Sequence, residues 1–173
     1  MKIAIGADGS GFELKEAIRK HLEELNIEYV DYAKEAREYY DIVPEVAPAV
    51  QSGECDYAIL CCGTGMGMAQ MANSYKGIRA AVVESTFAAR MCRAINNSNV
   101  LTMGGFIVAP FMACEMVDVF LNTQITEGLD DFHDFLLDAQ EKIKAVEEKI
   151  EKLEKVLDMI QFKCWYYEQA LAD

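Results

Sequence analysis

The sequence predicts an α/β protein, in which five parallel strands form a sheet with helices on both faces and a long helix follows. Two observations predict this fold. Up to Gly128, short apolar runs alternate with amphipathic runs, as in strand–helix–strand units. Beyond Gly128, apolar residues recur at alternating steps of three and four, the spacing of a heptad helix. We therefore expect a Rossmann-like three-layer sandwich over residues 1–130 and a helical oligomerisation extension over 131–173.

The chain begins with an apolar strand, a helix and a second strand. Ile3–Ala7 is uniformly apolar, and the helix that starts at Phe12 carries its apolar residues on one face. Ser10 and Glu13 have the spacing of a capping box at the start of this helix. Residues 27–32 then alternate in polarity, which indicates a second strand.

The remaining elements follow the same alternation. Residues 34–41 are polar and aromatic and predict a loop, and the apolar run Tyr57–Cys61 predicts a buried strand. Ser85 is the predicted N-cap of the helix after the fourth strand. The other predicted helices are 42–51, 66–74, 86–94 and 109–121, and the other predicted strands are 77–83 and 99–103.

The segment Cys62–Gly67 lies where the third strand turns into a helix, and it combines a thiol, a hydroxyl and three glycines. Glycines permit a tight turn and the close approach of a ligand to the backbone. A helix N-terminus offers unpaired N–H donors and partial positive charge, which hold anions and favour a thiolate. A thiolate there could remove a carbon-bound proton while the N–H groups hold an enediolate oxygen. A glycine-rich turn with inert, buried cysteines fits these residues equally well.

Composition excludes several classes of function. The formal net charge is −13, which argues against binding to nucleic acid or to an anionic membrane surface. The six cysteines form no CxxC pair, so neither a metal site nor a disulfide framework is expected, and we expect no cofactor. Free thiols suggest a reducing cytoplasm, and the start of the chain does not resemble a signal peptide.

The C-terminal part carries a long apolar seam with glutamate and lysine between its members. A seam of about four heptads favours a coiled coil with a partner chain, although a long amphipathic helix on its own domain has the same spacing. The seam residues are Phe132, Leu136, Ala139, Ile143, Val146, Ile150, Leu153, Leu157 and Ile160.

Four ordered motifs resemble the family of type B ribose-5-phosphate isomerases and galactose-6-phosphate isomerases over roughly residues 1–130. They are the start at 2–8 with 11–15, the core Cys62–Gly67, the segment 77–80, and the segment 96–104. The resemblance implies a metal-independent aldose–ketose isomerase that acts through a cis-enediolate on a sugar or sugar phosphate. It also implies sites at a homodimer interface, and the chain would form a dimer or a tetramer.

The resemblance assigns the site residues. It places the proton-transfer cysteine at Cys62 and the enediolate-binding hydroxyl at Thr64. Its anion hole is the backbone of Gly63, Gly65, Met66 and Gly67, with the Met66 side chain a candidate wall of the pocket. The remaining substrate-binding positions are Asp8 with its neighbour Gly9, Tyr39 and Asn96. From the strand pattern we expect Asp8, Cys62, Asn96 and Gly104 at the carboxyl ends of the strands, where such sheets bind ligands.

The chain also departs from the family pattern. Gly9 and Ile95 stand where histidines are usual, and Phe106 stands where an arginine is usual. The usual Gly-Arg-His segment reads Gly128-Leu129-Asp130. Arginine binds phosphate in a bidentate way that neutral side chains cannot replace, so the usual phosphate clamp is missing.

Three functions are therefore compatible with the sequence. The first is an active isomerase with an altered substrate, either unphosphorylated or held by other cations such as Lys15, Arg90 or Arg93. The second is a non-autonomous subunit that needs a paralogous chain to supply the missing histidine and arginine. The third is a degenerate member that binds a sugar or a protein without chemistry.

Overall fold

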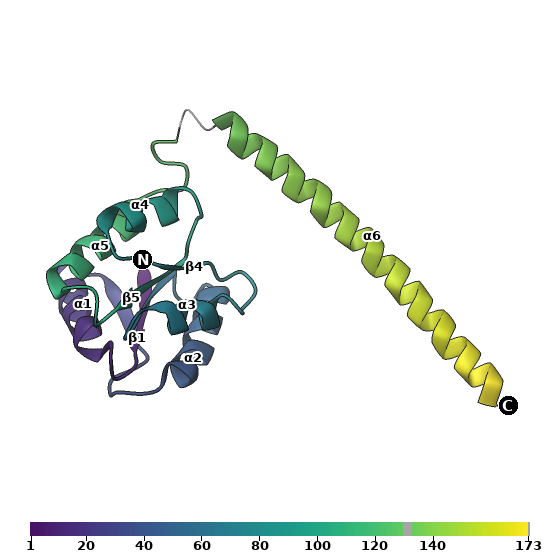
Figure 1. Cartoon of the computed structure of the whole chain (residues 1–173), viewed down its shortest axis with the longest axis horizontal. Helices are drawn as coiled ribbons and strands as arrows, with labels where there is room; N and C mark the ends of the chain where they lie inside the picture. Colours follow the sequence, from purple (N-terminus) through teal and green to yellow (C-terminus); the bar gives the residue numbers. More distant parts are fainter. Residues whose placement is uncertain (130–132, 173) are drawn as a thin grey trace. The chain divides into compact units, whose positions relative to one another are not determined.

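The computed structural model describes the backbone of residues 1–129 and 133–172. The chain forms two compact units, Met1–Gly128 and Leu129–Asp173, which we describe separately (Figure 1). The first unit contains the whole sheet and five helices, and the second contains one helix. None of the described helices is both long and apolar enough to cross a membrane.

The sheet of the first unit has five parallel strands in the order β2-β1-β3-β5-β4. This confirms the predicted parallel sheet and puts β3 at its centre. The strands are β1 (Lys2–Ala7), β2 (Glu28–Asp31), β3 (Tyr57–Cys62), β4 (Ala80–Val82) and β5 (Val100–Gly104).

Helices cover both faces of the sheet, so the three-layer prediction is also confirmed (Figure 1). Helices α1, α4 and α5 pack on one face around Ile59 and Leu101, and α2 and α3 pack on the other around Leu60. The alternation of buried side chains along β3 therefore sends Cys61 to one core and Cys62 to the other. The helices are α1 (Phe12–Glu24), α2 (Tyr39–Gln51), α3 (Met66–Ala72), α4 (Thr86–Ala94) and α5 (Pro110–Asn122).

Helix α2 begins at Tyr39, so the predicted loop over 34–41 is too long. The helix continues through Pro44 and Pro48, which are both exposed, while its buried face includes Ile42 and Val46. Each proline removes one backbone hydrogen bond, and burial of the apolar face offsets this loss.

The start of helix α1 also differs from the prediction. Its N-cap is Gly11, and no side chain caps it, so the expected capping box of Ser10 and Glu13 is wrong. Asp8 holds the loop before the helix instead, because its Oδ1 accepts the N–H groups of Ser10 (2.9 Å) and Gly11 (3.0 Å). These bonds tie the loop that leads into α1 to the residue that follows β1.

The second unit is helix α6, which runs from His133 to Ala172 over 40 residues. The predicted helix therefore extends beyond Ile160 and includes the aromatic segment around Trp165. Of the seam, Phe132 lies outside the described residues, as does the side chain of Leu136. The seam side chains from Ile143 to Ile160 are all exposed in the single chain.

Candidate active site

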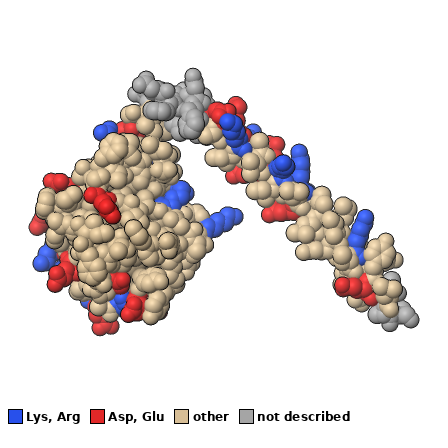
Figure 2. All heavy atoms as spheres, in the orientation of Figure 1, with Lys and Arg blue, Asp and Glu red and all other residues tan. Residues whose placement is uncertain are grey.

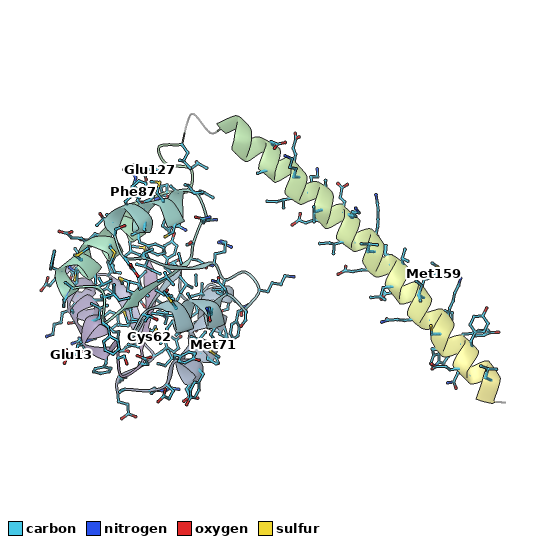
Figure 3. All side chains as sticks on the ribbon, in the orientation of Figure 1. Glu13, Cys62, Met71, Phe87, Glu127 and Met159 are labelled. Carbon is cyan, nitrogen blue, oxygen red and sulfur yellow. The ribbon has the colours of Figure 1, made fainter. Side chains whose placement is uncertain are left out.

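Cys62 is the last residue of β3, the central strand of the sheet. Its Sγ accepts the backbone N–H of Gly65 at 3.1 Å, and its side chain is largely buried (Figure 3). The loop can fold back onto the sulfur because Gly65 has a φ of 79°, in the left-handed region that favours glycine. A backbone N–H donor aimed at the sulfur would stabilise negative charge on it.

The neighbouring Cys61 has a different environment. It is fully buried in the opposite core, and this burial raises the pKa of its thiol far above the ordinary value. Cys61 is therefore an inert packing residue, as expected, and only Cys62 of the two lies at the strand-to-helix turn.

Asp8 lies beside Cys62 at the same edge of the sheet. It follows β1, whose residue Ala7 pairs with Cys61, and its N–H donates to the Cys61 carbonyl at 3.1 Å. One carboxylate oxygen, Oδ1, holds the loop that leads into α1. Gly9 is exposed next to it, and a β-carbon on Gly9 would lie 3.8 Å from the Ala36 β-carbon. The structure thus brings the predicted residues Asp8, Gly9 and Cys62 together.

The turn after Cys62 leaves several donors available. Thr64 is exposed, and its Oγ1 accepts the N–H of Met66 at 3.3 Å. Among the described residues, the N–H groups of Gly63, Thr64 and Gly67 have no acceptor. They are the donors that an anionic ligand at this turn would meet.

Tyr39 borders the same turn from helix α2. A β-carbon on Gly67 would lie 3.7 Å from the Tyr39 ring, an ordinary contact distance, so the ring lies directly beside Gly67. Tyr39, Tyr40, Gly67, Gln70 and Met71 line an open hollow. The Met66 side chain is about half exposed and does not line this hollow, so its place at the wall of a pocket stays a prediction.

Phe106 contributes a wall that the sequence did not identify as such. Its N–H donates to the Gly63 carbonyl at 3.1 Å, and its ring lies 2.9 Å from where a Gly63 β-carbon would be. The exposed Phe106 ring therefore lies directly over the turn. An apolar ring in this place gives no charge to hold a phosphate.

Asn96 does not lie at the carboxyl edge, so this part of the prediction is wrong for a single chain. Asn96 follows α4, and Asn99 after it accepts the N–H of Ala58 at the start of β3 (3.0 Å). Cys62 pairs with Gly104 at the opposite end of the strands, about 13 Å further along. In a parallel sheet each helix returns the chain to the amino ends of the strands, and Asn96 belongs to such a return turn.

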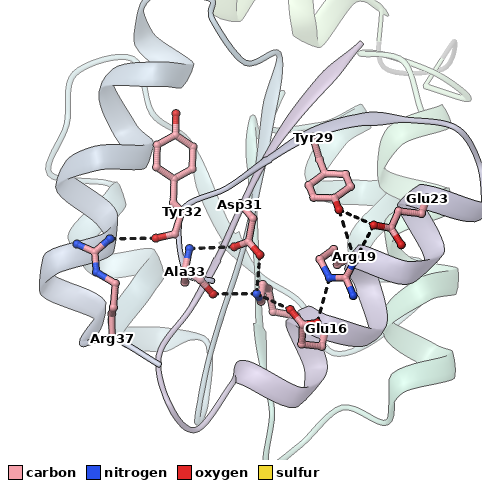
Figure 4. A network of polar contacts seen from close by, with 9 residues as sticks. Glu16, Arg19, Glu23, Tyr29, Asp31, Tyr32, Ala33 and Arg37 are labelled. Carbon is pink, nitrogen blue, oxygen red and sulfur yellow. Dashed lines mark hydrogen bonds and ion pairs between the residues drawn. The ribbon is translucent and has the colours of Figure 1, made fainter. Parts of the chain in front are cut away.

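Lys15 and Arg93, two of the three basic residues considered as phosphate ligands, already donate hydrogen bonds to other groups of the protein. The fully buried Lys15 amino group donates to Asp31 (2.8 Å) and to the Ala33 carbonyl (2.9 Å), in the network of Figure 4. Arg93 is buried and donates to Tyr57 Oη (3.0 Å) and the Ser98 carbonyl (2.6 Å).

The third cation, Arg90, is exposed and forms an ion pair with Glu127 at 3.2 Å. Near the site, Arg37 is joined to Asp8 by a backbone bridge, but its guanidinium pairs with Glu45 at 2.6 Å. Within residues 1–129 and 133–172, no cluster of side chains has the composition of a metal site.

Comparison with known proteins gives a consistent result. The family described as Ribose/Galactose Isomerase matches residues 3–134. The chain is 46% identical over 155 residues to the 4-deoxy-4-sulfo-D-erythrose isomerase of Clostridium sp. (strain MSTE9), covering 87% of this chain and 98% of the relative. It is 40% identical over 130 residues to ribose-5-phosphate isomerase B of Escherichia coli (strain K12), covering 73% and 87%.

A solved structure is also similar. Ribose-5-phosphate isomerase B of Clostridium thermocellum superposes with a TM-score of 0.71 at 37% sequence identity, covering 83% of this chain and 99% of that chain. The family match over residues 3–134 includes the strands from Ile3 onward, helices α1 to α5 and the turn that carries Cys62.

Proposed function

Because the chain belongs to the ribose/galactose isomerase family, we propose that it interconverts an aldose and a ketose by proton transfer at Cys62. The observation that carries this proposal is the position of the Cys62 sulfur, at the end of the central strand and 3.1 Å from the Gly65 nitrogen. The Gly65 N–H orients the Cys62 sulfur, so this orientation does not depend on a side-chain base among the described residues.

The proposed reaction has three proton transfers, two of which involve Cys62. The Cys62 thiolate takes the proton from C2 of the aldose, and the electron pair of that C–H bond forms the C1–C2 double bond of an enediolate. The negative charge on O1 is held by the free N–H groups of Gly63, Thr64 and Gly67, with the Thr64 hydroxyl beside them. The thiol then returns its proton to C1, the O2 hydroxyl proton ends on O1, and the ketose is released.

The site needs a second chain if Asn96 is to take part, because Asn96 lies at the far edge of its own sheet. We therefore propose a homodimer, or a tetramer of such dimers, in which one copy supplies Asn96 to the other. Exposed apolar side chains after β5, among them Phe106, Ile107 and Phe111, suit burial against such a copy. A paralogous partner chain is the alternative. Six free thiols suit the reducing cytoplasm, where we place the enzyme.

The proposed substrate is a four-carbon sugar with a terminal sulfonate. The relative named as a 4-deoxy-4-sulfo-D-erythrose isomerase matches 87% of this chain, which includes part of the C-terminal extension. A sulfonate carries a single negative charge, whereas a phosphate monoester carries about 1.5 to 2 at neutral pH. The weaker charge suits a turn covered by Phe106 and a protein of net charge −13.

The test is a proton NMR assay in heavy water with the full chain. It compares 4-deoxy-4-sulfo-D-erythrose with D-erythrose 4-phosphate, which has the same length, and with ribose 5-phosphate. We expect the highest kcat/KM on the sulfonate, with deuterium entering at the carbon that accepts the proton. A preference for either phosphate would overturn the substrate assignment, and the absence of both turnover and exchange would favour the degenerate or non-autonomous subunit.

The role of Cys62 is tested in the same assay. Cys62→Ala should lower kcat by about 10²–10⁴-fold, the usual contribution of a general base. The matched control is Cys114→Ala, a partly buried thiol of α5 whose Sγ lies 4.0 Å from the Ala17 carbonyl of α1, and this variant should keep its activity. Equal activities of the two variants would refute proton transfer by Cys62.

A further inference from the structure

Helix α6 carries its apolar seam through ten described layers, from Ala139 to Leu171. In heptad notation the a positions are Ile143, Ile150, Leu157, Cys164 and Leu171, and the d positions are Ala139, Val146, Leu153, Ile160 and Tyr167. The seam therefore continues about three turns beyond Ile160. Each of these side chains apart from Ala139 is exposed in the single chain. Removing their apolar surface from water would therefore favour association with another helix.

The positions that flank the seam divide by charge. The g positions include Lys142, Lys149 and Lys163, with Val156 between them, and no described g position is acidic. The e positions are Glu147, Glu154, Gln161 and Glu168, and none is basic. One side of the seam is thus positive and the other negative, and both signs lie along the helix in Figure 2.

This division selects one orientation for two copies of the helix. In a parallel, in-register pair, each g residue meets the e residue five positions later on the other copy. Lys142 then faces Glu147, and the same pairing recurs one and three heptads later, at Lys149 with Glu154 and Lys163 with Glu168. In an antiparallel pair g meets g and e meets e, so lysines face lysines and glutamates face glutamates.

We propose that α6 forms a parallel, in-register coiled coil with α6 of a second copy of this chain. The occupant is a second copy because one helix carries both halves of the charge pattern, and so it is complementary to itself. Within the chain, Lys142 contacts Asp138 at 2.5 Å, but both side chains are more than half exposed. A surface pair of this kind is weak and does not compete with closure of the seam.

The proposal predicts that Cys164 meets its own counterpart, because both occupy the same a layer. In an antiparallel pair centred on the helix, the two Cys164 residues would be about 35 Å apart, at 1.5 Å per residue. Cys164 is exposed, while Cys55, Cys61, Cys62 and Cys92 are buried. Mild oxidation with diamide should therefore give a disulfide-linked dimer, in which two thiols lose two protons and two electrons to the reagent.

The experiment measures the disulfide-linked dimer of the full chain on non-reducing gels and by peptide mass spectrometry. The K142E/K149E/K163E variant should lose most of the Cys164–Cys164 product, since glutamate would then face glutamate. The matched control K144E/K152E/K155E has the same net charge but changes only outward b, c and f positions, and it should cross-link like the native chain. Circular dichroism of each variant checks that the helix content is unchanged, as we expect.

A second arm restores the charge pairs between different chains. The E147K/E154K/E168K variant should cross-link poorly alone, but mixed with K142E/K149E/K163E it should form a heterodimer linked through Cys164. No Cys164–Cys164 product, or a product that the g-position reversal leaves unchanged, would overturn the proposal. Because the readout is a covalent link between tails, it is independent of whether the enzyme turns over any sugar.

Discussion

Gly11→Ala should destabilise the first unit and disturb the peptide that precedes Cys62. A β-carbon at Gly11 would lie 2.4 Å from the Cys61 carbonyl carbon and 2.6 Å from the Cys62 nitrogen, both of them backbone atoms. Ordinary contacts begin at 3.4 Å, so α1 and β3 must separate by about 1 Å, and overpacking of this kind costs about 1–3 kcal/mol. The melting temperature should fall by roughly 3–10 °C.

The assay is thermal unfolding followed by differential scanning calorimetry, with Gly9→Ala as the matched control. A β-carbon at Gly9 would lie 3.8 Å from Ala36, so this variant should unfold within about 0.5 kcal/mol of the native chain. Catalysis should also fall in Gly11→Ala, because the displaced peptide carries Cys62. If the two variants unfold at the same temperature, the close approach of α1 to β3 is not the constraint that we describe.

Three further predictions concern the rest of the first unit. Lys15→Met should cost about 3–5 kcal/mol in the free energy of unfolding, because it leaves Asp31 without its buried partner, whereas the exposed Lys34→Met should not. Burial raises the pKa of Cys61 above 9.0, so its contribution to stability is complete below that pH and is lost as the pH rises; denaturant titrations should show a smaller alkaline loss in Cys61→Ala. Ser85→Ala should cost about 1 kcal/mol by removing the 3.1 Å cap on Ala88, and Ser85→Thr should keep most of it, as measured by urea unfolding.

Much of the site follows from local sequence. The apolar run that ends at Cys62 predicts a buried strand, and the glycines after it predict a tight turn, because both depend on neighbouring residues alone. Alternating strands and helices place Asp8 and Cys62 at the same edge of a parallel sheet, as the structure confirms. Ser85 is likewise confirmed as a cap, since capping is a contact over three residues.

The tertiary structure decided what depends on contacts between distant segments. Asp8 rather than Ser10 holds the start of α1, and Lys15 is buried against Asp31 instead of facing a ligand. Asn96 lies at the amino edge of the sheet, because the chain reverses direction between each helix and the next strand.

Sequence by itself thus determined which residues form strands, turns and an apolar seam, since those depend on spacing along the chain. The fold decided which charged groups remain free and which residues share an edge, because both depend on how distant segments pack together, such as α5 and α1, where Cys114 meets Ala17 across 97 residues.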